Sequence, residues 1–130
     1  FFFFLIKAQS LLFDSELKIM EILWKGGETT ARSIAETLKE QIGWSKTTTY
    51  TVIKKCIDKG VVNRKEPGFV CRPLITKEQV QEFETRELID KMYDGGADRL
   101  VASLLNSQKL SMDEIQHLKQ LIDHFKQQDD

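Results

Sequence analysis

The sequence lacks the features that mark several large classes of protein. No apolar run approaches the ~18 residues that a membrane-spanning helix needs, so we expect no contact with a membrane. Two cysteines, Cys56 and Cys71, are too few for a disulfide framework, which favours the reducing cytoplasm. No glycine-rich phosphate loop, no H-E-x-x-H zinc motif and no grouped nucleophile, base and acid is present. These absences predict a protein that is not an enzyme and that takes no metal or other cofactor.

The charges are divided unevenly between the two parts of the chain. Residues 1–75 carry twelve Lys and Arg against eight Asp and Glu, a net charge of +4. Residues 76–130 carry seven against twelve, a net charge of −5. This division suggests a basic part that meets a polyanion and an acidic part that does not. A net charge of +4 spread over a whole domain attracts a polyanion only weakly. The positions of the individual basic residues are therefore the stronger evidence for such a partner.

The first residues stand apart from the rest. Residues 1–6 are apolar, with no basic residue ahead of them and no small-residue cleavage site, so they do not resemble a signal peptide. The chain begins without Met, and we interpret residues 1–10 as a tag remnant, a truncation or a terminus of uncertain identity. They are excluded from the fold prediction.

Apolar spacing predicts two short helices before residue 45. The first covers residues 12–24 with Asp14 or Ser15 as its N-cap, and the second covers residues 31–41 after a threonine cap. The expected buried positions are Leu17, Met20, Ile22, Leu23 and Trp24 in the first helix and Ile34, Ala35 and Leu38 in the second.

A third helix is predicted over residues 46–59, capped by Ser45 and ended by Gly60. Its apolar positions are Val52, Ile53, Cys56 and Ile57. Its opposite side carries Lys46, Thr47, Thr48, Thr49, Tyr50, Thr51, Lys54 and Lys55. Threonine is a poor helix former, so something other than helix stability explains this polar side.

Two short β-rich runs, residues 61–65 and 69–74, flank a Glu-Pro-Gly turn and predict a hairpin. Three short helices followed by a hairpin is the order of a winged helix-turn-helix. We therefore expect an α+β fold, mostly α, with the winged helix over residues 11–75.

The polar side of the third helix and the basic hairpin suit double-stranded DNA. A helix in the major groove reads bases from its N-terminal turns, and threonine offers both a hydroxyl and a methyl group. A basic wing can contact phosphates. The predicted DNA-binding residues are Ser45, Lys46, Thr47, Thr48, Tyr50, Thr51 and Lys54 on the helix and Arg64 and Lys65 on the wing. The alternative is an ordinary solvated helix face.

Residues 76–130 are predicted to be a helical region. Helices are expected over residues 77–93, around residues 100–105, and after an S-x-x-E capping box at Ser111. Their apolar stripes exceed what short helices can bury against each other, which predicts dimerisation. The expected dimerisation residues are Leu100, Leu104, Leu118, Leu121, Ile122 and Phe125.

Sequence motifs along nearly the whole chain resemble those of one family of bacterial repressors, the BlaI/MecI/CopY family. The matching motifs are Leu17-x-Ile19-Met20-x-x-Leu23-Trp24, Thr30-Ala31-x-x-Ile34, Trp44-Ser45-x-x-Thr48-x-x-Thr51-x-Ile53-x-x-Cys56-x-x-Lys59-Gly60, Leu88-x-x-Lys91-x-Tyr93-x-Gly95-Gly96, Val101-Ala102-Ser103 and Leu110-Ser111-x-x-Glu114-Ile115-x-x-Leu118. The resemblance implies a transcriptional repressor of β-lactam-resistance or copper-homeostasis genes. It also implies a homodimer on a palindromic operator.

The resemblance carries over unevenly to the release mechanism. The copper branch senses metal through C-terminal Cys-x-Cys pairs, and this chain has no cysteine after Cys71. In the β-lactam branch a sensor-linked protease cuts the repressor, and the corresponding bond falls at about Ser103-Leu104. The family's cut members have Asn-Phe there, so release of this chain by such a protease stays an open alternative.

Two further sets of residues are candidates for a metal site or a redox sensor, but simpler roles are favoured for both. His117 and His124, with Asp113 before them, could line one helix face as metal ligands, but solvated or interface histidines are favoured. Cys56 and Cys71 are interpreted as buried small apolar residues in preference to a redox sensor. The main functional alternative is a winged-helix adaptor that binds proteins without sequence-specific DNA binding.

Overall fold

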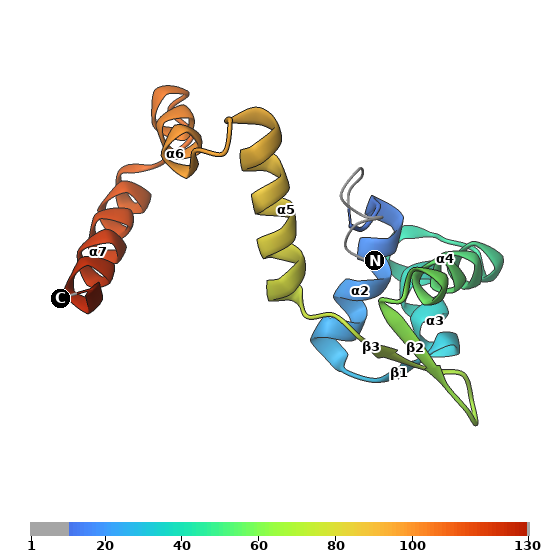
Figure 1. The fold of residues 1–130 in the computed structure, drawn as a ribbon. Coiled ribbons are helices and arrows are strands. Elements are labelled where there is room, and N and C mark those ends of the chain that lie inside the picture. The colour runs from blue at the N-terminus through green and yellow to red at the C-terminus, as the bar shows by residue number, and fades with distance from the viewer. Residues whose placement is uncertain (1–10, 130) are drawn as a thin grey trace. The chain divides into compact units, whose positions relative to one another are not determined.

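The computed structural model describes residues 11–129, so the prediction for residues 1–10 lies outside the described part (Figure 1). The described residues form two compact units, one that ends at Thr85 and one that begins at Arg86, and each is considered by itself. Helix α5 (Lys77–Met92) begins in the first unit and ends in the second.

The first unit is a winged helix-turn-helix, as predicted. Its elements before α5 are α2 (Asp14–Gly26), β1 (Thr29–Thr30), α3 (Ala31–Ile42), α4 (Lys46–Lys59), β2 (Val62–Lys65) and β3 (Val70–Pro73). The three helices gather beside the small sheet, and the β2–β3 turn projects beyond them (Figure 1). The class is α+β with mostly helical content, which confirms the predicted fold class.

Helix α2 begins at Asp14 without a side-chain cap. The predicted N-caps Asp14 and Ser15 were wrong, because the N-cap position is held by Phe13. Phenylalanine cannot accept a hydrogen bond, but Glu16 in the first turn accepts one from the Phe13 backbone N–H at 2.8 Å. Half of a capping box therefore suffices to begin the helix.

The next two helices begin at polar caps, as the sequence predicts. Thr30 Oγ1 accepts a hydrogen bond from Ser33 N, and Ser45 Oγ accepts one from Thr48 N, each at 3.1 Å. Helix α4 then ends at Gly60, whose φ of 84° lies in the left-handed region that glycine adopts without strain. The predicted bounds of α4, residues 46–59, are confirmed.

The sheet has three antiparallel strands in the order β1-β3-β2. The hairpin pairs Arg64 with Cys71 and Lys65 with Val70. Strand β1 was not predicted; its Thr30 lies opposite Val70 on the other side of β3. A two-residue strand whose partner is far away in the sequence leaves no local pattern to detect.

The core of the first unit lies between the helices and the sheet. Its fully buried side chains include Leu11, Ile19, Met20, Leu23, Ile34, Leu38, Ile53, Cys56, Val61 and Val62. Leu17, Ile22, Trp24 and Ile57 pack only at its edge, and Ile19, which the prediction left out, is central. Thr49 was expected on the polar side of α4, but its side chain is buried. The burial of Thr49 follows from helical spacing, because it lies one turn before Val52 and Ile53.

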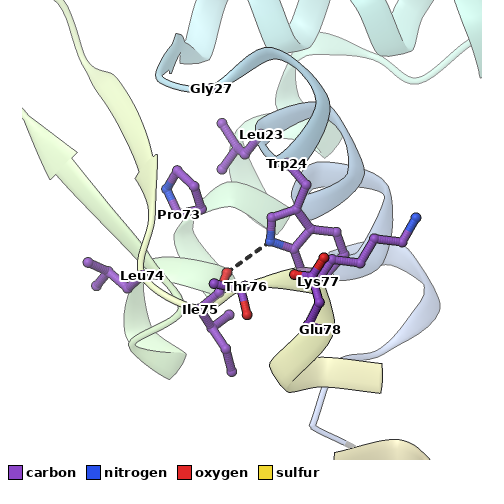
Figure 2. A pocket seen from close by; sticks show the side chains of 9 residues that line it. All are labelled: Leu23, Trp24, Gly27, Pro73, Leu74, Ile75, Thr76, Lys77 and Glu78. Carbon is purple, nitrogen blue, oxygen red and sulfur yellow. Dashed lines mark hydrogen bonds between the residues drawn. The ribbon is translucent and has the colours of Figure 1, made fainter. Parts of the chain in front are cut away.

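The start of α5 belongs to this unit. Trp24 Nε1 donates a hydrogen bond of 2.9 Å to the Ile75 carbonyl, at a hollow lined by α2 and the segment that enters α5 (Figure 2). Val80 is buried in the core, and Leu11 N donates to Glu84 Oε1 at 3.0 Å. The compact unit therefore continues to Thr85, beyond the boundary expected at residue 75.

The second unit contains the end of α5, α6 (Ala97–Asn106) and α7 (Met112–Asp129). The predicted capping box is confirmed: Glu114 N donates to Ser111 Oγ at 3.1 Å, and Ser111 N donates to Glu114 Oε1 at 2.9 Å. Among residues 86–128, whose exposure the structure describes, only Ile89 is buried. A unit of three helices with a single buried residue has almost no core of its own.

Candidate nucleic-acid interface

Helix α4 presents a polar stripe along its first three turns. A buried stripe formed by Thr49, Val52, Ile53 and Cys56 fixes the rotation of the helix against the core. The opposite side chains therefore face outward, and Ser45, Lys46, Thr47, Thr48, Thr51 and Lys54 are exposed, whereas Tyr50 is half-buried. The residues Lys46, Thr47, Tyr50, Thr51 and Lys54 line a shallow open groove.

Three hydroxyl groups on this stripe, those of Ser45, Thr48 and Thr51, are hydrogen-bonded locally. Ser45 Oγ donates to Thr48 Oγ1 at 3.0 Å, and Thr51 Oγ1 donates to the Thr47 carbonyl at 2.9 Å. These bonds orient the side chains and leave acceptor lone pairs and methyl groups on the outer surface. Such groups can accept from base amino groups or contact thymine methyls.

The two basic residues predicted on the wing are exposed, but each has an acidic partner. Arg64 Nε lies 2.6 Å from Glu66 Oε1, and Lys65 Nζ lies 3.2 Å from Glu28 Oε1. The hydrogen bond from Arg64, with a second from Phe69 N, lowers the pKa of the Glu66 carboxyl below its ordinary value. Exposed ion pairs of this kind are weak, so a phosphate can compete for either cation.

A cluster that the sequence analysis missed joins the wing to α4. The Phe69 ring packs edge-on against Tyr50, with centroids 5.7 Å apart and planes at 88°. The Arg64 guanidinium lies over the same ring, 3.6 Å from its centroid. Phe69 was expected to open the second β-run, but it lies in the turn before β3, and its aromatic side chain directly after Pro-Gly was the available signal.

Both cysteines are buried, in agreement with the simpler interpretation. Burial and the nearby Glu16 carboxylate raise the pKa of Cys56 to about 12, and burial also raises the pKa of Cys71. A thiol held in its protonated form is a poor nucleophile and a poor redox sensor.

Other candidate sites gain no support from geometry. Within the described part of the chain, no three His, Cys, Asp or Glu side chains are grouped so that they could hold a metal. His124 contacts Gln128 at 3.0 Å on the exposed surface of α7, and His117 is exposed. None of the helices between residues 11 and 129 combines the length and the apolar character that a membrane crossing requires.

The predicted dimerisation residues lie on α6 and α7 of the second unit. Leu104 is 36 % exposed, Leu121 41 %, Ile122 53 % and Phe125 63 %, whereas Leu100 and Leu118 are half-buried. The Ser103-Leu104 bond lies inside α6, where Ser103 Oγ accepts a hydrogen bond from Tyr93 OH at 3.3 Å.

Comparison with known proteins decides the family. The family model for the penicillinase repressor matches residues 12–124. The chain belongs to the penicillinase repressor family. The penicillinase repressor of Bacillus licheniformis is 28 % identical over 115 residues, which cover 87 % of this chain and 90 % of that protein. The methicillin resistance regulatory protein MecI of Staphylococcus aureus is 29 % identical over 111 residues, which cover 84 % of this chain and 90 % of that protein.

A solved structure agrees with the winged-helix assignment. The solution structure of the DNA-binding domain of the repressor BlaI is 28 % identical and superposes with a TM-score of 0.50. It covers 54 % of this chain and 88 % of that domain. The predicted resemblance is thus confirmed, and the penicillinase repressor family is a family of DNA-binding transcriptional repressors without enzymatic function.

Proposed function

We propose that this repressor binds a palindromic operator as a homodimer and reads it with α4 in the major groove. The observation that carries the proposal is the outward stripe of α4, where threonine hydroxyls and methyls stand between Lys46 and Lys54. Short hydroxyl-bearing side chains allow a helix to approach base edges closely. The lysines at the two ends supply phosphate contacts that hold the helix in register.

The wing supplies binding energy without sequence information. Arg64 and Lys65 lie next to each other on β2, and their acidic partners are exposed and exchangeable. Where Arg64 and Lys65 contact phosphates, counterions leave the DNA, and the affinity becomes dependent on salt.

A second copy of the chain is the proposed cover for the apolar surface of α6 and α7. No residue of α6 is buried, although its sequence is rich in leucine and valine. Large apolar side chains are also exposed along α7, and the last of them is Phe125, which is 63 % exposed. Exposed apolar area of this kind marks an interface, and a two-fold dimer matches two half-sites of a palindrome.

A sensor-linked protease could release the repressor from DNA by cutting this chain, but helix α6 would first have to unfold locally. The Ser103-Leu104 bond lies in regular α-helix. Because α6 contributes no buried side chain, opening this helix costs little compared with unfolding the first unit. Cleavage there would detach the residues from Leu104 onward, which carry most of the exposed apolar side chains of the second unit, from the DNA-binding unit.

An electrophoretic mobility shift with DNA from upstream of the chain's own gene tests the proposal. We expect a shifted band that survives competition by unrelated duplex and weakens steeply with salt. Binding without sequence preference and without strong salt dependence would favour the adaptor alternative. Thr48→Ala, with Thr85→Ala on α5 as a matched control, separates readout by α4 from general effects of removing a threonine.

A further inference from the structure

The hairpin turn holds one arginine in a defined orientation. The Phe69 ring covers one face of the Arg64 guanidinium, with 3.6 Å between Cζ and the ring centroid. Glu66 Oε1 accepts a hydrogen bond of 2.6 Å from Arg64 Nε, so the Nε edge is also occupied. For the two terminal nitrogens the structure gives no hydrogen-bond partner among residues 11–129. These nitrogens remain for a ligand.

Phe69 is itself fixed from three sides. Its N–H donates to Glu66 Oε2 at 3.2 Å, and its carbonyl accepts a bond of 2.9 Å from Ala31 N at the start of α3. Its ring packs edge-on against Tyr50 of α4. Its φ of 51° lies in the left-handed region, which a bulky residue adopts only when its surroundings hold it there. The turn is therefore built around this side chain.

We propose that Phe69 is a positioning residue that orients Arg64 for a bidentate contact with a DNA phosphate. This inference rests on the proposed function. A guanidinium can offer two parallel N–H donors to a phosphate, and a side chain ordered before binding loses less entropy on binding. Lys65 contrasts with Arg64, because its ammonium has only the exposed carboxylate of Glu28 beside it. Arg64 therefore acts through geometry, and Lys65 acts as a mobile charge.

Two charge-conserving substitutions separate geometry from charge. Lysine has neither the flat face that stacks on Phe69 nor the fork that binds two oxygens. We expect Arg64→Lys to weaken binding to both operator and unrelated duplex about tenfold, at one fixed salt concentration. Arg99→Lys on α6, at an exposed arginine that pairs with Asp94 and lies outside the proposed DNA contacts, should stay within about twofold of the wild type. An Arg64→Lys variant that also stays within twofold would overturn the proposal, because charge alone would then suffice.

Phe69→Leu removes the ring, and Phe13→Leu is its matched control. Phe13 is half exposed at the start of α2, and the Lys59 ammonium lies 4.2 Å from its ring centroid. We expect Phe69→Leu to weaken DNA binding about tenfold and Phe69→Tyr to restore it. The Phe69→Leu/Arg64→Lys double variant should bind no more weakly than either single variant. Multiplying effects would mean that the two residues act independently, which contradicts a positioning role.

A spectroscopic measurement on the full wild-type chain covers the case in which Phe69→Leu does not fold. Stacking on the ring should move the NMR signals of the Arg64 side chain upfield in the absence of DNA. Operator binding without this shift would overturn the positioning role alone. A chain that shows the shift but binds no duplex would overturn the proposed function and the phosphate contact with it.

Discussion

The Lys59 ammonium forms an ion pair with the Glu16 carboxylate, which joins the last turn of α4 to the first turn of α2. The Glu16 side chain is 2 % exposed and that of Lys59 21 %. The same carboxylate oxygen accepts the Phe13 backbone N–H, so one acidic side chain both starts α2 and holds the end of α4. This contact fixes the axis of the helix that we place in the major groove.

Removing the lysine should therefore destabilise the first unit. Lys59→Ala leaves the Glu16 carboxylate buried without its cation, and we expect the free energy of unfolding to fall by about 3 kcal/mol. Urea denaturation followed by circular dichroism measures this change. Lys55→Ala, an exposed lysine on the same helix, is the control and should change stability by less than about 0.5 kcal/mol. Equal stability of the two variants would show that the ion pair contributes nothing.

Specific readout should depend on the outward threonines of α4. We expect Thr48→Ala and Thr51→Ala each to reduce the free energy of operator binding by about 1–3 kcal/mol, because base contacts are lost while phosphate contacts remain. Binding to unrelated duplex should be unchanged. Fluorescence anisotropy with both DNAs measures the two affinities, and unchanged operator preference in both variants would remove α4 from the readout.

Helix α4 was predictable because its signals are local. Ser45 and Gly60 mark its ends, and the spacing of Val52, Ile53 and Cys56 gives its buried side. The same spacing also places Thr49 on the buried side of the helix. Threonine is common on exposed surfaces, so the run of threonines led to the wrong prediction that Thr49 lies on the polar side. A residue's chemical type is thus weaker information than its position on the helix.

The sequence predicts that the wing is a hairpin, but it does not predict the side-chain contacts of the wing. The acidic partners of Arg64 and Lys65 and the packing of Phe69 on Tyr50 depend on side chains brought together by folding. The Lys65–Glu28 pair and the Phe69–Tyr50 contact join residues far apart in the sequence, so charge counts and periodicity do not reveal them. Strand β1 was missed for the same reason.

The two thiols should be protected in the folded chain. Cys56, whose pKa is raised to about 12 by burial, stays protonated at pH 8, and only the thiolate attacks a disulfide reagent. We expect neither Cys56 nor Cys71 to react with a thiol reagent until urea is added. Rapid reaction of the native chain would show that the thiols are accessible.

The same pKa predicts a loss of stability in alkali. Between the ordinary thiol pKa of 9.0 and about 12, the unfolded chain releases a proton from Cys56 that the folded chain retains. The unfolded state then binds fewer protons, so the free energy of unfolding falls as the pH rises through this range. Cys56→Ala should show a shallower fall, and parallel pH profiles for the two proteins would contradict the assignment.

The second unit should carry the dimer contact. Leu118→Asp places a charge among the apolar side chains of α6 and α7, and we expect it to turn a dimer into a monomer at micromolar concentration. Truncation after Thr85 should have the same effect while keeping the core residue Val80. Sedimentation equilibrium measures the molar mass. A dimer after truncation, or a monomeric intact chain, would show that these helices do not join two copies.

The central claim, a dimeric repressor that reads a symmetric site with α4, is tested most directly by selecting binding sites from a pool of random duplex DNA. The intact chain should enrich a two-fold symmetric sequence whose half-sites are separated by about one helical turn, roughly 10 base pairs, or a multiple of it. The Thr48→Ala/Thr51→Ala variant should lose this enrichment. Failure of the wild-type chain to enrich any sequence, or enrichment of a single half-site without symmetry, would contradict the account.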